Sequence, residues 1–282
     1  MFAPQSVDLK ELKLNVMVGP AAGDPLILLH GVSRSSRDFA PLFPALTARW
    51  QVLAVDQRGH GQSSRAGSYF VRDYAADVVG LLDARPAFGP AVIYGHSLGA
   101  LVATCVAARK PEAVRAIILE DPPTASMISE IKRTSFYPHF AAMQKLSSSR
   151  LPTSEVARQL AEVRLPGIAG EVRLGDLRDG VSLRLVARCL KEVDPAVYDS
   201  LLAGRWMEGV DWIETIRAVR CPVLLLAADE KAGGMLSRSA VDEMKQNVAD
   251  IISLPHPGIG HLIHWHATET CLRHVLGFLE SL

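Results

Sequence analysis

One serine in the sequence stands in a setting that favours chemistry. Ser97 lies in Gly95-His96-Ser97-Leu98-Gly99, directly after the apolar run VIY and before the helix-forming stretch LGALVATCVAAR. A nucleophile at a sharp strand-to-helix turn needs small neighbours, because larger side chains would collide where strand and helix pass closely. The pattern therefore predicts that Ser97 is a reactive nucleophile. The alternative is a tight turn in which the serine only caps the helix.

Groups that could assist such a serine lie on both sides of it in the sequence. The apolar run LILL leads into residues 30–33 (HGVS), where the glycine lets the backbone turn so that the N–H of Val32 can face the site. Together with the N–H of Leu98 it would form an oxyanion hole, which stabilises negative charge on a carbonyl oxygen. Near the C-terminus, residues 256–264 offer histidines as a general base.

Five short, wholly apolar runs recur along the chain, and each is bounded by turn residues. They are LILL at 26–29, VLAV at 52–55, AVIY at 91–94, AIIL at 116–119 and VLLLAA at 223–228. Such runs are typical of strands buried on both faces, and they alternate with helix-length segments such as 70–84 and 98–109. We therefore expect an α/β fold with a mostly parallel, doubly wound sheet, whose loops at the strand carboxyl ends carry the chemistry.

The strand–helix alternation is interrupted once. It stops after the DPP segment at 121–123 and resumes near CP at 221–222. The intervening sequence has leucine and arginine at helical spacing, as in SEVARQLAEVRL and SLRLVARCLKEV, which predicts a helical insertion. The chain thus divides into a core of residues 1–121 and 213–282 and a helical insertion of residues 122–212.

The overall composition limits the partners. The 282 residues carry 30 basic and 30 acidic side chains, so nothing indicates binding to nucleic acid or to an anionic membrane. The expected partner is a small molecule that is not highly charged. Four cysteines lie far apart without a Cys-x-x-Cys pair, which fits reduced thiols, and the N-terminal residues show no signal-peptide pattern. We therefore predict a cytoplasmic protein, whose oligomeric state the sequence leaves open.

With these motifs in view, the chain resembles the α/β-hydrolase fold family. HGVSRSS, DQRGHGQSS, GHSLGA and GHLIH occur in family order across nearly the whole length. The resemblance implies Ser97 as the nucleophile, His261 as the general base, and Val32 and Leu98 as backbone donors to the oxyanion. It also implies that residues 122–212 form a cap over the site.

The type of nucleophile restricts the reactions. Relatives that open epoxides or remove halides attack with a carboxylate at the position of Ser97, so these activities are excluded. Acyl transfer to water remains, in which His261 takes the proton of Ser97 and returns it to the leaving group without a metal or organic cofactor. The cluster of His256, His261, His264 and His266 permits a metal-site alternative, which we disfavour because no clustered acidic or cysteine ligand accompanies it.

The motifs favour one function over two alternatives. We predict a serine hydrolase, similar to carboxylesterases and lactonases, that cleaves a small carboxylic ester, lactone or related acyl compound. Phe140 and Met143 of the insertion are expected to line its acyl pocket, although such residues pack more often in a core. The alternatives are a hydrolase of a carbon–carbon bond next to a ketone, and a ligand receptor of the same fold with little or no turnover.

The carboxylate that orients His261 departs from the usual family position. Relatives commonly place it three residues after a glycine that ends the strand equivalent to VLLLAA. In this chain that alignment puts Lys231 at the position of the acid. A lysine cannot orient an imidazolium, so the acid must lie elsewhere.

Asp121 is the acid that we favour. It ends the run AIILE before two prolines, where some family members, including certain dehalogenases and lactone hydrolases, carry their acid. Asp229 is the main alternative, and Glu120 and Glu230 are the remaining ones, because geometry and not sequence position defines such a triad. The acid should accept a hydrogen bond from His261 Nδ1 at about 2.6 to 3.2 Å.

Overall fold

The apolar runs form the centre of one sheet in the computed structural model, which describes residues 2–20, 23–86, 89–167 and 170–282. All five predicted strands are confirmed, and three more complete the sheet. Its strands are β1 (Ala3–Asp8), β2 (Lys13–Val18), β3 (Pro25–Leu29), β4 (Gln51–Val55), β5 (Ala91–His96), β6 (Val114–Glu120), β9 (Val223–Ala228) and β10 (Ile251–His256).

The strand order is β1-β2-β4-β3-β5-β6-β9-β10. The pairs from β4 to β10 are parallel, whereas β1 and β2 are antiparallel to their neighbours. The predicted parallel, doubly wound sheet is therefore confirmed, with an antiparallel edge. The sequence pattern missed β1 and β10, the edge strands, and β2, which lies next to an edge, because these three strands are only partly buried and need no continuous apolar run.

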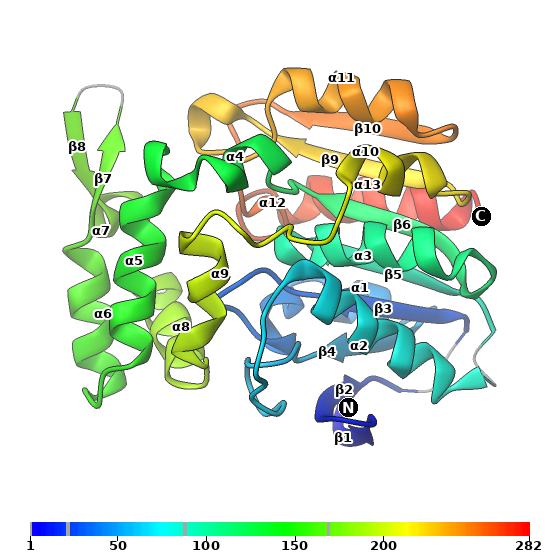
Figure 1. Cartoon of the computed structure of the whole chain (residues 1–282), viewed down its shortest axis with the longest axis horizontal. Helices are drawn as coiled ribbons and strands as arrows, with labels where there is room; N and C mark the ends of the chain where they lie inside the picture. Colours follow the sequence, from blue (N-terminus) through cyan, green and yellow to red (C-terminus); the bar gives the residue numbers. More distant parts are fainter. Residues whose placement is uncertain (1, 21–22, 87–88, 168–169) are drawn as a thin grey trace.

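Helices cover both faces of the sheet and gather at one end of it (Figure 1). They are α1 (Phe43–Leu46), α2 (Val71–Asp83), α3 (Leu98–Arg109), α4 (Ala125–Ser129), α5 (Phe136–Ser147), α6 (Thr153–Ala161), α7 (Leu174–Leu177), α8 (Gly180–Lys191), α9 (Asp199–Leu202), α10 (Trp212–Ala218), α11 (Arg238–Asn247), α12 (Ile263–His266) and α13 (Thr268–Glu280). The helices predicted at 70–84 and 98–109 correspond to α2 and α3.

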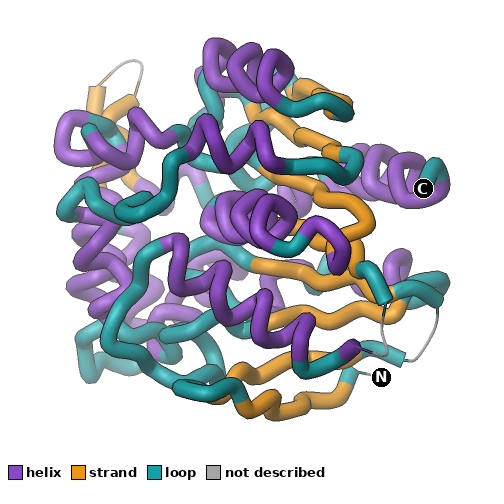
Figure 2. Tube along the Cα trace, turned by 45° about the vertical axis from the view of Figure 1, so that its right-hand side comes forward, coloured by secondary structure: helices purple, strands orange, loops and turns teal. Residues whose placement is uncertain are grey.

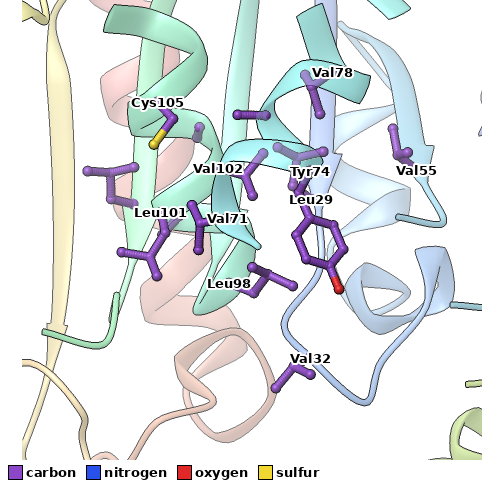
Figure 3. Close-up of a cluster of buried hydrophobic side chains, with 14 of the residues drawn as sticks. Leu29, Val32, Val55, Val71, Tyr74, Val78, Leu98, Leu101, Val102 and Cys105 are labelled. Atoms are coloured by element: carbon purple, nitrogen blue, oxygen red, sulfur yellow. The ribbon is translucent and has the colours of Figure 1, made fainter. Parts of the chain in front are cut away.

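Two buried layers hold the sheet. Because successive side chains of a strand point to opposite faces, Ile27 and Leu29 of β3 join a cluster with α2 and α3, whereas Leu26 and Leu28 pack with α13. Figure 3 shows part of the first cluster, with Leu29 close to side chains of α2 and α3. The apolar core thereby fixes the ends of β3, β5 and β6, from which the functional loops emerge.

The segment predicted as an insertion contains α4 to α9 and a two-stranded antiparallel hairpin, β7 (Arg164–Gly167) and β8 (Gly170–Arg173), which the sequence did not predict. Helices α5 to α8 stand together beyond one end of the strands in both views (Figures 1 and 2). Helix α10, which begins at the end of this segment, packs against α3 of the core. Residues 168–169 of the segment lie outside the described residues, and the exact division at 122 and 212 stays a prediction.

Candidate active site

The turn at Ser97 has the strained geometry that the sequence pattern requires. Ser97 has a φ of 53° and a ψ of −114° between the end of β5 and the start of α3. A Cβ atom on Gly95 would lie 2.1 Å from the carbonyl oxygen of Gly99, and one on Gly99 would lie 1.9 Å from that of Leu29. The two glycines are therefore needed for close packing of strand and helix. The Ser97 side chain makes no capping hydrogen bond to α3, so its hydroxyl is not used as a helix cap.

Backbone strain is concentrated around this turn. Among the described residues, the non-glycine residues with positive φ are Ser33, Ser97 and Asp121. They follow the carboxyl ends of β3, β5 and β6, which are neighbours in the sheet. Each such conformation costs about 1 to 3 kcal/mol, and strained residues of this kind cluster at functional sites. The carboxyl edge of these three strands is thus the candidate active site.

His261 makes the hydrogen bond that we predicted for Asp121. Its Nδ1 lies 2.6 Å from Oδ2 of Asp121, within the expected range. The Asp121 side chain is fully buried and also accepts backbone N–H groups from Met235 at 2.8 Å and from Ala228 and Leu236 at 3.3 Å. These backbone donors fix the Asp121 carboxylate in position against the ring of His261.

The other candidate carboxylates have different partners. Asp229 accepts the backbone N–H groups of Lys231 and Gly258, which fixes the turn after β9. Glu120 binds His264 and the hydroxyl of Tyr94. Glu230 makes no hydrogen bond or ion pair with His261, whose Nδ1 is bonded to Asp121. Asp121 is therefore the carboxylate in place to orient His261, while its catalytic role stays a prediction.

One cavity brings the predicted groups together. Its lining includes Ser97, His261, Val32, Phe140 and Met143, so both the core and α5 of the insertion contribute to it. The cavity volume is about 40 Å³, which is enough for about three water molecules. The space beside Ser97 is therefore small.

Of the two expected oxyanion donors, Val32 lines this cavity, and Leu98 directly follows Ser97, which lines it too. Figure 3 shows Val32 beyond the end of β3 and Leu98 at the first turn of α3. Neither backbone N–H donates a hydrogen bond to another residue that the structure describes. Leu98 is the first residue of its helix, so its N–H has no partner within that helix and is free for a ligand.

A second histidine–carboxylate pair lies directly behind the first. His264 is fully buried, with Nδ1 2.8 Å from Glu120 and Nε2 3.5 Å from Asp38. Although burial opposes a charge, the two carboxylates raise the pKa of His264 to about 10. His96 lies between the two pairs and donates from Nε2 to the carbonyl of His261 at 3.0 Å, while burial lowers the pKa of His96 to about 3. His96 therefore stays neutral and holds the His261 loop in position.

The histidines of the C-terminal segment do not converge on a metal site. His261 and His264 bind separate carboxylates, and His256 contacts His274 at 3.2 Å. Within the described part of the chain, no group of three or more potential ligands is close enough to hold a metal ion.

Three site residues escaped the sequence analysis. Arg34 and Arg178 line the cavity, and Asp38 lies 3.7 Å from Arg34 in the buried network. Arg34 stands in the HGVSRSS motif two residues after Val32, so its position near an oxyanion donor was a signal. Arg178 had no local signal, because only the folding of the insertion brings it to the cavity.

The described helices include none that is long and apolar enough to cross a membrane. Location in the cytoplasm stays a prediction.

The sequence is similar to known proteins along most of its length. A family model described as the α/β-hydrolase fold matches residues 24–230. The chain is 25% identical to the 2-(acetamidomethylene)succinate hydrolase of Mesorhizobium japonicum, over 99% of this chain and 96% of that protein. It is 25% identical to the sn-1-specific diacylglycerol lipase ABHD11 of Xenopus laevis, over 96% of this chain and 84% of the relative.

Solved structures share the fold along the whole chain. The enol-lactonase from Burkholderia xenovorans LB400 superposes with a TM-score of 0.74 at 16% identity, covering 98% of this chain and 100% of that one. At this identity the likeness shows the fold alone. The named sequence relatives are hydrolases, and the predicted fold class is confirmed.

Proposed function

We propose that this chain, which belongs to the α/β-hydrolase fold family, hydrolyses a small carboxylic ester, lactone or related acyl compound with Ser97 as its nucleophile. The observation that carries the proposal is that Ser97 and His261 line the same cavity, while Nδ1 of His261 is hydrogen-bonded to the buried carboxylate of Asp121. A relative named as a hydrolase of a substituted succinate supports a small acyl substrate.

The reaction follows from these positions. Ser97 Oγ attacks the substrate carbonyl carbon while His261 Nε2 takes the hydroxyl proton, and the carbonyl oxygen becomes an anion that the N–H groups of Val32 and Leu98 stabilise. Asp121 accepts from Nδ1 and stabilises the imidazolium that forms. Collapse of the intermediate breaks the acyl–oxygen bond, and the alcohol leaves with the proton from His261.

Water completes the cycle. It attacks the acyl-serine ester while His261 takes one of its protons, and that proton returns to Ser97 Oγ as the acid is released. Each turnover thus consumes one water and yields one acid and one alcohol. No step requires a group other than these side chains and backbone donors.

A fluorophosphonate probe and short-chain nitrophenyl esters test the proposal, with Ser97→Ala as the control. We expect rapid labelling at Ser97, mapped by peptide mass, together with ester turnover that the substitution abolishes. Labelling without turnover of any acyl compound would instead indicate a receptor. A protein that is inert to both reagents, or a Ser97→Ala variant that keeps full turnover, would refute the assignment.

Phe140 and Met143 are predicted to set the acyl-chain preference. They lie three residues apart on one side of α5, and both side chains are buried at the cavity. Truncating either to alanine should enlarge the acyl pocket and shift the kcat/KM ratio of hexanoyl to acetyl esters upward by about tenfold, because each methylene in an apolar pocket contributes about 1 to 3 kcal/mol.

The control for this shift is Leu146→Ala. Leu146 is equally buried on α5 but does not line the cavity, so its truncation should cost stability without changing the ester profile. If all three variants keep the wild-type profile across a series of nitrophenyl esters, the acyl chain does not bind against α5.

A further inference from the structure

The cavity that holds Ser97 has an uneven charge distribution. Two arginines, Arg34 and Arg178, contribute to its lining, and no aspartate or glutamate that the structure describes does. The whole chain has balanced charges, so this local excess of positive charge is a property of the site. Neutral esters have no group that would require two guanidinium ions beside the reacting carbonyl.

Among the described residues, no carboxylate forms an ion pair with the guanidinium of Arg178, and the charge of Asp38 acts on it only weakly, from a distance. Arg178 lies between α7 and α8 in the insertion and is partly buried, and its guanidinium makes no hydrogen bond or ion pair with any residue in the described ranges. Burial, together with the neighbouring charge of Arg34, lowers the pKa of Arg178 to about 10. The guanidinium remains charged at neutral pH, and a desolvated cation without a partner is unfavourable unless a ligand supplies the anion.

Arg34 reaches the same cavity from the core. Arg34 is about nine-tenths buried. Its Nη1 lies 3.7 Å from Oδ1 of Asp38, which is too far for a hydrogen bond. Asp38 also faces His264 at 3.5 Å and accepts from Trp265 at 3.2 Å, so its charge is shared within the buried network. Asp38 therefore positions Arg34 without occupying its hydrogen-bond donors.

His139 adds a polar group to the same wall. It lines the cavity, and its Nδ1 is buried without a hydrogen-bond partner among the residues that the structure describes. Burial and the positive charges of Arg178 and Arg34 lower the pKa of His139 to about 3, so its ring is neutral and offers one N–H to a ligand.

We propose that the acyl group of the substrate carries a carboxylate, which binds between Arg34 and Arg178 while Ser97 attacks the ester or amide carbonyl at the other end. This inference rests on the proposed function, because it assigns the carboxylate to the acyl substrate of the same serine. Two guanidinium groups present the planar, paired donors that match carboxylate geometry. The small cavity limits the substrate to a short chain, such as a half-ester of a four- or five-carbon diacid.

Matched esters test the proposal in the catalytic reaction. Monoethyl succinate carries the carboxylate and diethyl succinate lacks it, and a pH-stat follows the hydrolysis of both. We expect a higher kcat/KM for the half-ester. Arg178→Gln and Arg34→Gln should each lower that value by about 10- to 100-fold, chiefly through KM, and change the diester value by less than about threefold.

Arg188→Gln is the matched control, since Arg188 is an exposed arginine of α8 outside the cavity lining. It should leave both substrates unchanged. The carboxylate proposal is wrong if Ser97-dependent turnover occurs but the diester has the same kcat/KM as the half-ester, or if Arg178→Gln slows both substrates equally. In either case the proposed function stands.

Binding provides a readout that does not depend on turnover. Succinate should stabilise the Ser97→Ala variant against thermal unfolding and give a calorimetric binding signal, whereas uncharged succinamide should do neither. Adding Arg178→Gln should weaken succinate binding by about 10- to 100-fold, and adding Arg188→Gln should not. Absence of succinate binding at millimolar concentration, or equal binding of succinamide, would overturn the proposal even if neither ester is a substrate.

Discussion

Replacing His261 with alanine is expected to lower kcat for ester hydrolysis by about 10⁵- to 10⁶-fold. The Ser97 hydroxyl then has no base to take its proton, and the leaving alcohol has no acid to protonate it. The fold should persist, because the His261 side chain is 17% exposed and Asp121 keeps its three backbone donors. Steady-state kinetics and thermal unfolding of the same preparation measure both effects.

His264→Gln is the contrasting variant, because it changes a histidine–carboxylate pair three residues away that does not line the cavity. It should reduce stability more than turnover, since Glu120 and Asp38 would lose their buried cation. If His264→Gln lowers kcat of the folded protein as much as His261→Ala does, or if His261→Ala keeps activity, the assignment of the base is wrong.

The pH dependence of stability identifies the role of His264. Its folded pKa of about 10 lies above the unfolded value of about 6.5, so the folded state binds the proton more tightly. This contribution to stability is fully present below about pH 6.5 and is lost as the pH rises toward 10. The melting temperature of His264→Gln should therefore vary less over this range than that of the wild type. His274→Gln on the outer helix α13 should keep the wild-type slope, because the pKa of His274 is lowered.

The sequence predicted the parts of the molecule whose physics is local. Buried central strands need continuous apolar runs, and a strand-to-helix turn at a nucleophile needs glycines, so β3 to β6, β9 and the Ser97 turn were visible without a structure. The oxyanion donors could be predicted for the same reason, since Val32 and Leu98 stand in the turns that follow β3 and β5.

The remaining features depend on contacts between distant parts of the chain. The hairpin β7–β8 lies in a sequence without strand periodicity, and its pairing is stabilised by the surrounding helices. Arg178 reaches the cavity only because the insertion folds over the core, and Asp38 meets His264 across more than two hundred residues. No periodicity or motif in the sequence reports such distances, so the charged residues of the site could be identified only from the structure.

The same distinction explains why the acid had to be chosen between alternatives. Asp121 and Asp229 both follow strands that end at the same edge of the sheet, and the sequence cannot measure their distances to His261. In the structure, Asp121 is hydrogen-bonded to the ring of His261, whereas Asp229 accepts hydrogen bonds from two backbone N–H groups. Each aspartate therefore has a different physical task, which mutation can separate.

Asp121→Asn should lower kcat by about 10⁴-fold with little change in the fold. Asparagine is nearly isosteric, but its amide cannot stabilise the imidazolium of His261, and its NH₂ group can favour the wrong tautomer. Both oxygens of Asp121 accept backbone N–H groups, Oδ2 from Met235 and Oδ1 from Ala228 and Leu236. An amide nitrogen in either position would therefore face a donor and cost some stability.

Asp229→Asn is the matched control, because it makes the same chemical change on the neighbouring strand. It should weaken the turn after β9 and leave kcat within about threefold of the wild type, since the Asp229 side chain accepts the backbone N–H groups of Lys231 and Gly258 and makes no hydrogen bond to His261. Kinetics of the two variants at equal folded fraction, checked by circular dichroism, compare them directly. A large loss of kcat in Asp229→Asn together with near-normal kcat in Asp121→Asn would assign the orienting carboxylate to β9, and would require His261 to turn toward that strand during catalysis.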